Sequence, residues 1–584
     1  MFITTSCYDF LNVNKDPNNP TTLTVDQALP PILFYAAQLT YDHAEYGVYL
    51  AQALTTTGNL QTGSLAYSSG WEFLNMNRHP QWRRHFFDIG MNNLRMMEAA
   101  EELGAMNYVL IGRTIRLLST MLTTDAFGDM PHSEAFFYTS PRYDTQESIY
   151  EWMFAEADEL IRLYSDDSWI NAPGNLPITQ RIDRIYSGDL AKWGAFTKAL
   201  RARLWIRKLP NWQNTPDVAN RIVEMVDEVL ANPNWQEPRY YYPGGVTESN
   251  NPWGPAKMAI NAWESRPNRL DVSVPTRFFA AILGTYHSPN PTRRFALDPR
   301  AERLMHPRDR AGNVVLSSEA PIRFLESNIG MDVDDRVIMF PDLYADQGAT
   351  GPTNPFTQNT GYIALMLHEE LLFIKAEAQY WAGNVTGAFE TTRDAVLYNM
   401  RRLGVTGSDG SDLTGAERTR FDRFFEVRLP GPGVFTIADV MQQKFVAMYL
   451  QPEQWTDMRR YNHSSSTNGI TYNGVEIYTI TRVHRGAGNT NLVSDFTATY
   501  ALRRPFNLFT PYWMTPENFG ANAPLSPNAW VHRLNYDPET EERYNARELE
   551  RLGAFRNPDW LRRRMIWARN DSGVANSAND TEWK

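Results

Sequence analysis

One segment of the chain decides the fold: Asp189-Leu-Ala-Lys-Trp-Gly-Ala-Phe-Thr-Lys-Ala-Leu-Arg-Ala-Arg-Leu204. Its apolar residues recur every three to four positions, which is the period of an α-helix that buries one face. Asp189 stands directly before the pattern, where a carboxylate can accept hydrogen bonds from the first free N–H groups of a helix. The segment predicts a capped amphipathic helix with Arg201, Arg203 and Arg207 off its apolar stripe.

A second helical pattern lies further along the chain, at 365–382 and 386–403. Gly383-Asn384 separates its two halves and is a typical helix stop. Small residues at Ala376, Ala388 and Ala395 allow the two helices to approach closely. This arrangement matches a tetratricopeptide-type helix hairpin, although no regular repeat of about 34 residues runs through the chain.

Further helical patterns and several irregular segments complete the coarse organisation of the chain. Helices are expected at 26–54, 80–103, 107–121 and 149–164. Loop-rich segments, in which proline, glycine, asparagine and aromatic residues concentrate, are expected at 232–300, 349–361 and 462–499, the last with a hairpin turn at 472–475. We predict a mainly α fold, in which tetratricopeptide-like helix pairs form a scaffold for long loops and a few short strands. A single domain is expected over 21–569, followed by a disordered tail at 570–584.

Composition excludes several classes of protein. The 584 residues carry a net charge of −11 without a block of like charge, which argues against a nucleic-acid-binding surface. The sequence contains no run of about 18 apolar residues, so it predicts no membrane-spanning helix. Basic residues are mostly arginine and are scattered over the predicted helix faces, so we assign them no functional part.

The only cysteine of the chain, Cys7, lies in Thr4-Thr-Ser-Cys-Tyr-Asp9. A lone cysteine has no partner for an intramolecular disulfide. The small residues before it and the polar stretch after it are typical of a lipoprotein cleavage site, so we expect Cys7 to be lipidated and residues 1–20 to form a tether. Six residues are too few for a complete signal peptide, which points to an earlier start.

The sequence lacks the motifs of the common catalytic classes. It contains no nucleophile elbow, phosphate-binding loop or zinc-protease motif. Glu369 and Glu370 are adjacent on a helix and are expected to be solvated or ion-paired, since glycosidases take their two carboxylates from separate elements. We therefore predict that the protein is not an enzyme and needs no cofactor. Two acidic groups could bind structural calcium: Asp332, Asp334 and Asp335, and Asp409 and Asp412. Neither fits the twelve-residue calcium-binding loop pattern, so acidic surface turns are the favoured interpretation.

Aromatic and amide side chains in the loops are the remaining candidates for a binding site. Sugars present apolar C–H faces and hydroxyl groups, so their sites combine flat aromatic rings with neutral hydrogen-bonding groups and arginine. The candidate ligand-binding residues are Tyr67, Trp71, Asn75, Asn77, Arg78, Trp82, Trp253 and Trp263, with Asn268 nearby. Each tryptophan could instead pack its loop onto the core, and a peptide groove would use the same side chains.

Several segments together resemble one known family. The chain is similar to SusD/RagB-type outer-membrane lipoproteins of Bacteroidetes. The matching segments follow the order of that family: 9–18 after Cys7, 129–135, 141–150, 189–204, 370–378, 454–461 and Arg503-Arg-Pro505. The resemblance extends over nearly the whole chain.

The resemblance implies a largely helical fold built on four tetratricopeptide-like helix pairs. It also implies a lipid-anchored protein that faces the cell exterior, captures a nutrient and acts as a lid on a SusC-type TonB-dependent outer-membrane barrel. Oligosaccharide is the expected ligand. Oligopeptide capture by the same architecture, a surface glycoside hydrolase and a purely structural helical-repeat scaffold remain open alternatives.

Overall fold

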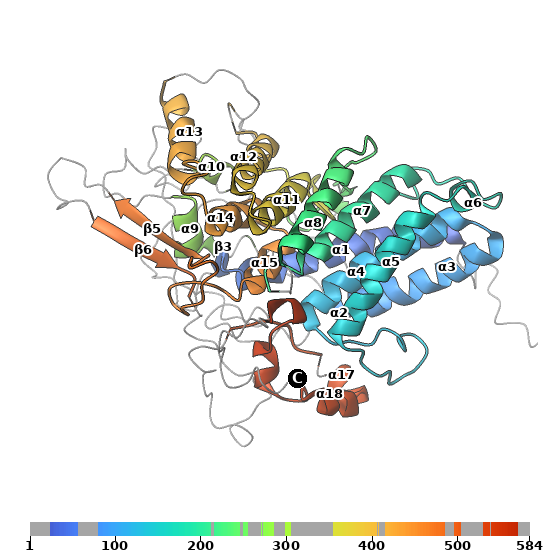
Figure 1. The fold of residues 1–584 in the computed structure, drawn as a ribbon. Helices are drawn as coiled ribbons and strands as arrows, with labels where there is room; N and C mark the ends of the chain where they lie inside the picture. The colour runs from blue at the N-terminus through green and yellow to red at the C-terminus, as the bar shows by residue number, and fades with distance from the viewer. Residues whose placement is uncertain are drawn as a thin grey trace, which may run out of the picture.

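Helices dominate the computed structural model of the chain (Figure 1). The residues that it describes are 24–56, 80–211, 215–245, 249–254, 270, 273–284, 298–304, 354–405, 407, 415–484, 496–503, 530–537 and 539–569. Their apolar side chains form one core cluster that extends from Val25 to Ala568, so the described segments fold around a common interior.

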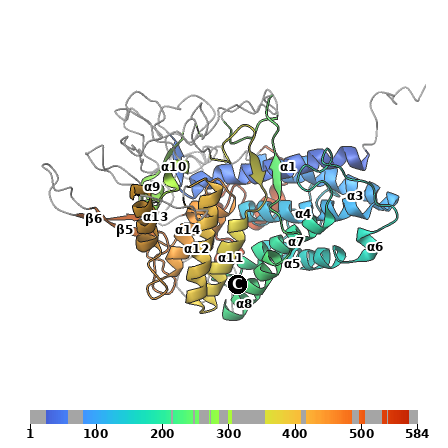
Figure 2. The ribbon, with the colours of Figure 1, turned by 90° about the horizontal axis from the view of Figure 1, so that it is seen from above.

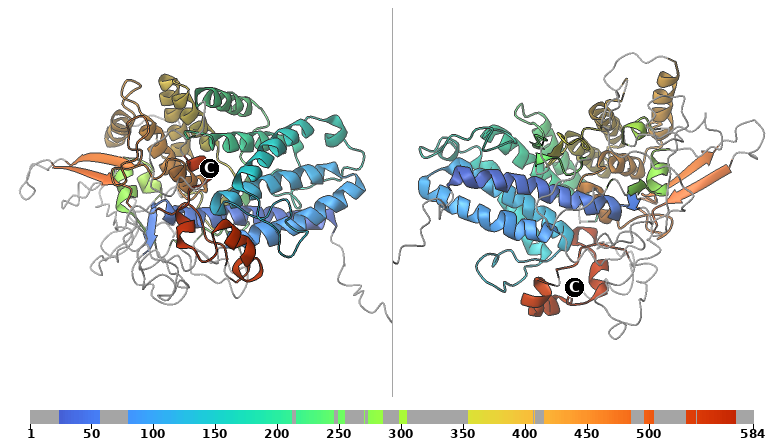
Figure 3. Two further views of the ribbon diagram at one scale, coloured as in Figure 1. Left: turned by 60° about the horizontal axis from the view of Figure 1, so that its bottom comes forward. Right: turned by 180° about the vertical axis from the view of Figure 1, so that it is seen from behind.

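The first half of the chain forms a bundle of long helices (Figure 3). Helix α1 packs against α3, α4 and α15, and α4 also packs against α5 and α7. The bounds of these elements are α1 (Val25–Leu50), α2 (Pro80–Arg83), the π-helix η3 (Arg84–Met91), α3 (Asn92–Leu103), α4 (Met106–Phe127), α5 (Gln146–Leu163), α6 (Asp167–Ile170), α7 (Leu190–Ile206), α8 (Thr215–Leu230) and α15 (Glu453–Arg460). Gly104, at φ 72°, ends α3 in the left-handed conformation that glycine adopts without strain.

Helix α11 (His368–Trp381) joins this bundle to the second half of the chain (Figure 2). It packs against α12 (Val385–Arg402), α8, α14 (Ile437–Ala447) and α7. Ala376 in α11 and Ala388 and Ala395 in α12 are fully buried, and the two helices pack against each other. The small side chains therefore permit the close helix hairpin that the sequence predicts. The remaining helices of this half are α9 (Arg277–Ile282), α10 (Ala301–Leu304) and α13 (Gly415–Arg428).

Short strands form three antiparallel two-stranded ribbons in the described residues. The pairs are β1 (Leu54–Thr56) with β3 (Ser273–Pro275), β2 (Arg239–Tyr241) with β4 (Tyr362–Ala364), and β5 (Thr479–His484) with β6 (Phe496–Ala501). The β5–β6 ribbon extends outward from the helices (Figure 1). Asn473 and Gly474 form the predicted tight turn, both with positive φ, between the bridged residues Tyr472 and Val475.

The C-terminal segment packs back onto the first half of the chain (Figure 3). It contains α17 (Glu541–Tyr544), α18 (Ala546–Leu552) and two short 3-10 helices (Pro558–Arg562 and Ile566–Ala568). The Leu534 N–H donates to the Ala126 carbonyl at 2.7 Å, which ties this segment to the end of α4. Residues about 400 positions apart therefore lie side by side.

The mainly helical fold class is confirmed, and several details differ from the sequence-based expectation. The first helix ends at Leu50 rather than residue 54, because residues 54–56 pair with β3. The helix expected over 80–103 contains the π-helical segment η3. The segment 232–300 contains not only loop but also β2, β3 and α9.

Candidate functional site

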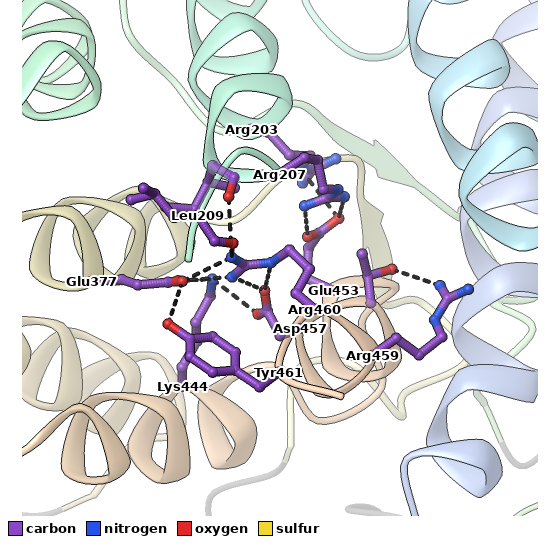
Figure 4. Close-up of polar contacts among 12 residues, drawn as sticks. Arg203, Arg207, Leu209, Glu377, Lys444, Glu453, Asp457, Arg459, Arg460 and Tyr461 are labelled. Atoms are coloured by element: carbon purple, nitrogen blue, oxygen red, sulfur yellow. Dashed lines mark hydrogen bonds and ion pairs between the residues drawn. The ribbon is translucent and has the colours of Figure 1, made fainter. Parts of the chain in front are cut away.

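A cluster of ten buried charged side chains lies where α4, α7, α11, α14 and α15 meet, and Figure 4 labels all of them except Asp125 and Glu370. Its five cations and five carboxylates balance, and each is less than a tenth exposed. The cations are Arg203, Arg207, Lys444, Arg459 and Arg460, and the carboxylates are Asp125, Glu370, Glu377, Glu453 and Asp457. A buried charge is tolerated only when it is paired and hydrogen-bonded, so these contacts decide what the cluster can do.

Arg207 at the end of α7 bridges two carboxylates. Its Nη1 and Nη2 donate to the two oxygens of Glu453 at 2.7 Å each, and its Nε and Nη2 donate to Asp125 at 3.1 and 2.9 Å. One turn earlier, Arg203 holds both oxygens of Glu370 at 2.6 Å. These two-pronged arginine–carboxylate pairs fix α4, α7, α11 and α15 relative to one another.

Arg460 forms the second half of the cluster (Figure 4). It donates to both oxygens of Glu377 at 2.8 Å and to Asp457 at 2.6 Å, and its Nη1 also reaches the Ile206 and Leu209 carbonyls. Lys444 lies 2.9 Å from Asp457 and 3.4 Å from Glu377. The end of α7 is therefore held through its backbone as well as through its side chains.

Arg459 is paired differently from the other arginines. Its guanidinium lies over the rings of Trp455, at 3.4 Å, and Trp567, at 5.2 Å, and donates to the Asp125 and His532 carbonyls. Burial, together with the nearby Arg207, lowers the pKa of Arg459 to about 9. Trp567 also donates its indole N–H to the Asp125 carboxylate at 3.1 Å. Asp125 and Arg459 thus attach the C-terminal segment to the helices.

The electrostatics of the cluster favour a structural role. The arginine partners Arg207 and Arg460 outweigh the effect of burial and hold the pKa values of Glu453 and Glu377 below the usual range. These carboxylates are ionised, engaged by cations and covered by helices. They do not form the open pair of carboxylates that glycoside hydrolysis needs.

Two expectations about charged residues can be compared with the structure. Glu369 and Glu370 are ion-paired, which is one of the two expected states, and both are buried, with Arg402 and Arg203 as their respective partners. Arg203 and Arg207 do not lie on a solvated helix face. The helix α7 packs against α4, α5, α8 and α11. The apolar stripe predicted from the sequence therefore covers less of the surface of α7 than is actually buried.

The predicted ligand-binding residues fall into two groups. Tyr67, Trp71, Asn75, Asn77, Arg78, Trp263 and Asn268 lie outside the described residues, as do Cys7 and the two candidate calcium groups. Trp82 and Trp253 are described, and both are buried. Trp82 donates to Glu541 at 3.1 Å and packs against Phe86, Phe127 and Tyr536, while Trp253 packs on Tyr41. Their rings are covered by protein, as structural tryptophans are.

The loop that carries Trp253 is fastened to a second loop by one asparagine. The Asn251 amide donates to the Phe356 carbonyl at 2.7 Å and to the Gln358 carbonyl at 2.9 Å, and the backbone N–H of Asn251 donates to the Asn359 carbonyl at 2.8 Å. A Cβ at Gly361 would lie 2.5 Å from the Asn251 amide nitrogen, so glycine is required for this approach. Beside these loops, Tyr241 in β2 is half-exposed and lies 5.5 Å from the Tyr362 ring. Sequence reasoning missed Tyr241, although Arg239-Tyr-Tyr-Tyr242 is an aromatic run.

Two further features concern metals and membranes. Among the described residues, no three histidine, cysteine or acidic side chains come together as metal ligands. No helix in the described part of the chain is both long enough and apolar enough to cross a bilayer.

Comparison with known proteins assigns the family. The SusD-like family model described as "Starch-binding associating with outer membrane" matches residues 17–479, and the chain belongs to this family. A search of curated proteins finds no match.

Solved structures support the same fold. A SusD/RagB family protein from Bacteroides thetaiotaomicron superposes with a TM-score of 0.60 at 16% identity, over 94% of this chain and 100% of the other. A chitin-binding SusD homologue from Flavobacterium johnsoniae gives 0.57 at 15% identity, over 94% and 99%. A SusD homologue from Bacteroides fragilis gives 0.56 at 14% identity, over 94% and 100%. The resemblance noted in the sequence is confirmed.

Proposed function

We propose that this protein captures oligosaccharides at the outer-membrane surface and delivers them to a SusC-type TonB-dependent transporter. One observation carries the proposal: the match to a starch-binding, outer-membrane family over residues 17–479. The chitin-binding homologue of similar fold supports a glycan ligand. Lipidation of Cys7 is part of the proposal, since it would hold the domain at the membrane.

The helical scaffold and the buried charge cluster support a binding role. The cluster joins helices of the scaffold and leaves its carboxylates engaged by cations, so these carboxylates are unsuited to bond cleavage. Capture is then the task of the loops, with Trp71 and Trp263 as the proposed stacking platforms. Aromatic stacking and neutral hydrogen bonds contribute about 1 kcal/mol each, which gives the modest affinity that a protein needs in order to release its cargo.

Calorimetric titration of the domain without residues 1–7 tests the proposal. The panel contains malto- and chito-oligosaccharides of several lengths and a set of short peptides. We expect heat from at least one oligosaccharide, and at least a tenfold loss of affinity in Trp71→Ala or Trp263→Ala. Trp169→Ala, in α6, is the matched control and keeps the affinity of the wild type.

Two results would contradict this reading. Binding of peptides without any response to sugars would assign the site to oligopeptides. Release of shortened sugars from an incubated oligosaccharide, detected by chromatography, would assign a hydrolase.

A further inference from the structure

Arg116, on α4, is a half-buried arginine whose guanidinium has no anionic partner in the described part of the chain. The guanidinium lies over the Trp152 ring of α5, with 5.0 Å between its carbon and the ring centre. It makes no ion pair or hydrogen bond with the described residues. Because a guanidinium has five N–H donors, all of them are available to a ligand.

Two carboxylates in the surroundings are already engaged by other groups. Glu156, on α5, accepts hydrogen bonds from Arg113 Nε and Nη2 at 2.7 Å each, one on each oxygen. Asp144, in the loop before α5, accepts from the His132 and Ser133 N–H groups at 2.9 and 2.8 Å. Ser133 Oγ donates to the other oxygen of Asp144 at 2.9 Å. Neither carboxylate is therefore free to pair with the guanidinium.

Two imidazoles lie beside the same guanidinium. The His132 ring packs on Trp152 with 4.3 Å between ring centres, so His132 and Arg116 contact one indole. His85, on the π-helix η3, is 5% exposed, and its Nδ1 lies 3.2 Å from Ser119 Oγ, one turn after Arg116 on α4. Each imidazole keeps at least one ring nitrogen that makes no hydrogen bond with the described residues.

The electrostatics of these side chains lack a compensating anion. Burial, followed by the nearby His132 and Arg116, lowers the pKa of His85 to about 3. Burial, followed by Arg116, lowers the pKa of His132 to about 4, although Asp144 opposes this effect. Both imidazoles are therefore neutral near pH 7, and each can donate one N–H group. The arrangement is a single guanidinium charge beside two uncharged donors.

We propose that Arg116, His132 and His85 form a binding site for an oxyanion, which is a sulfate, a phosphate or a carboxylate group. A guanidinium binds two oxygens of such a group through parallel N–H donors, and its contact with the indole favours one orientation of its plane. The imidazoles add donors from two further elements, the loop before α5 and η3. The conformation of η3 agrees with a binding role, because π-helical segments occur frequently at functional sites. The oxyanion site does not depend on the proposed capture of sugars.

Histidine NMR spectroscopy of the full chain tests the oxyanion site. The ten histidines are labelled with ¹³C at Cε1, and the signals of His85 and His132 are assigned from the variants His85→Gln and His132→Gln. Sodium sulfate is titrated at pH 7, with sodium chloride of equal ionic strength as the reference. We expect saturable shifts of these two signals and no shift of the signal of His463, which is buried after α15.

Variants of two arginines separate specific binding from general salt effects. Arg116→Gln removes the charge and the paired donors, so we expect sulfate to bind at least about tenfold more weakly. Arg221→Gln is the matched control, because Arg221 on α8 also lies 5.0 Å from the centre of a tryptophan ring, that of Trp205. It retains the affinity of the wild type. If Arg116→Gln does not fold, Arg116→Lys replaces it, with several-fold weaker binding expected because lysine keeps the charge but not the paired donors.

The possible outcomes separate the oxyanion site from the proposed function. Absence of shifts over the whole titration, or equal affinity in the wild type and Arg116→Gln, would overturn the site. Shifts of similar size in all histidines would show a general salt effect and would also overturn it. Parallel titrations with sodium phosphate and sodium glucuronate identify the source: tighter binding of an inorganic ion identifies a free ion, and tighter binding of glucuronate identifies an acidic sugar. Sulfate binding without capture of any oligosaccharide would support the site and contradict only the proposed function.

Discussion

Removal of Arg207 is the sharpest test of the buried charge cluster. In Arg207→Met, Glu453 loses both of its 2.7 Å hydrogen bonds and keeps only the more distant Arg203, 3.8 Å away. Asp125 keeps its bonds from Tyr150 and Trp567. Removing one partner of a buried ion pair typically costs about 3–5 kcal/mol, because an ionised group is left without compensation. We expect a loss of that size in the free energy of unfolding.

The assay is urea denaturation followed by tryptophan fluorescence, since Trp455 and Trp567 lie beside the cluster. A double variant, Arg207→Met/Glu453→Gln, removes the stranded charge and is expected to recover part of the loss. Arg162→Met is the matched control, because its partners Glu159 and Asp166 are on the surface and such pairs contribute about 0–1 kcal/mol. If Arg207→Met and Arg162→Met lose the same stability, the reasoning is refuted.

Three further predictions concern the histidines, the loops and the packing of Phe136 on the π-helix η3. Burial lowers the pKa of His463 to about 3 and that of its neighbour His532 well below its usual value. As the pH falls below about 6.5, the unfolded chain binds protons at both imidazoles while the folded protein does not, so the free energy of unfolding decreases. His463→Gln should therefore reduce the loss of unfolding free energy between pH 7 and pH 5 by about 2 kcal/mol, and an unchanged pH profile would contradict this. Asn251→Ala removes two side-chain hydrogen bonds to buried carbonyls and should cost about 2–4 kcal/mol and speed proteolysis at the two joined loops; a cleavage rate equal to that of the wild type would exclude the fastening role. Gly90→Ala places a methyl group against the Phe136 ring and should lower the thermal unfolding midpoint, whereas an unchanged midpoint would show that the ring moves aside freely.

The helices could be predicted from the sequence because their signals are local. Asp189 caps α7 as expected, accepting hydrogen bonds from the Ala191 and Lys192 N–H groups, and Thr145 caps α5. Apolar periodicity also predicted the α11–α12 hairpin, and the two helices do pack against each other.

The buried arginines could not be predicted in the same way. Arg203 and Arg207 have the helical spacing of exposed residues, and their burial depends on the distant carboxylates Glu370, Glu453 and Asp125. The Arg203–Glu370 and Arg207–Glu453 pairs join residues 167 and 246 positions apart, so the periodicity of the local sequence does not reveal them. The sequence of α7 is rich in alanine and tryptophan as well as arginine. This composition would have predicted a helix that is buried on all sides.

The candidate binding residues show the same limit. The residue type alone selected Trp82 and Trp253 together with Trp71 and Trp263. A tryptophan that stacks on a sugar cannot be distinguished by its residue type from a tryptophan that packs in the core. The structure separates the first two, which are covered by Tyr536 and Tyr41 among others, and leaves Trp71 and Trp263 as the proposal.

Uptake of a labelled oligosaccharide by the source bacterium tests the central claim most directly. The strain lacking this protein is compared with strains that express the wild type or Trp71→Ala/Trp263→Ala, at limiting concentrations of a sugar that the isolated domain binds. We predict that uptake falls in the deletion strain and is restored by the wild type but not by the variant. Equal uptake in all strains at every concentration would contradict the assignment of this protein to oligosaccharide capture.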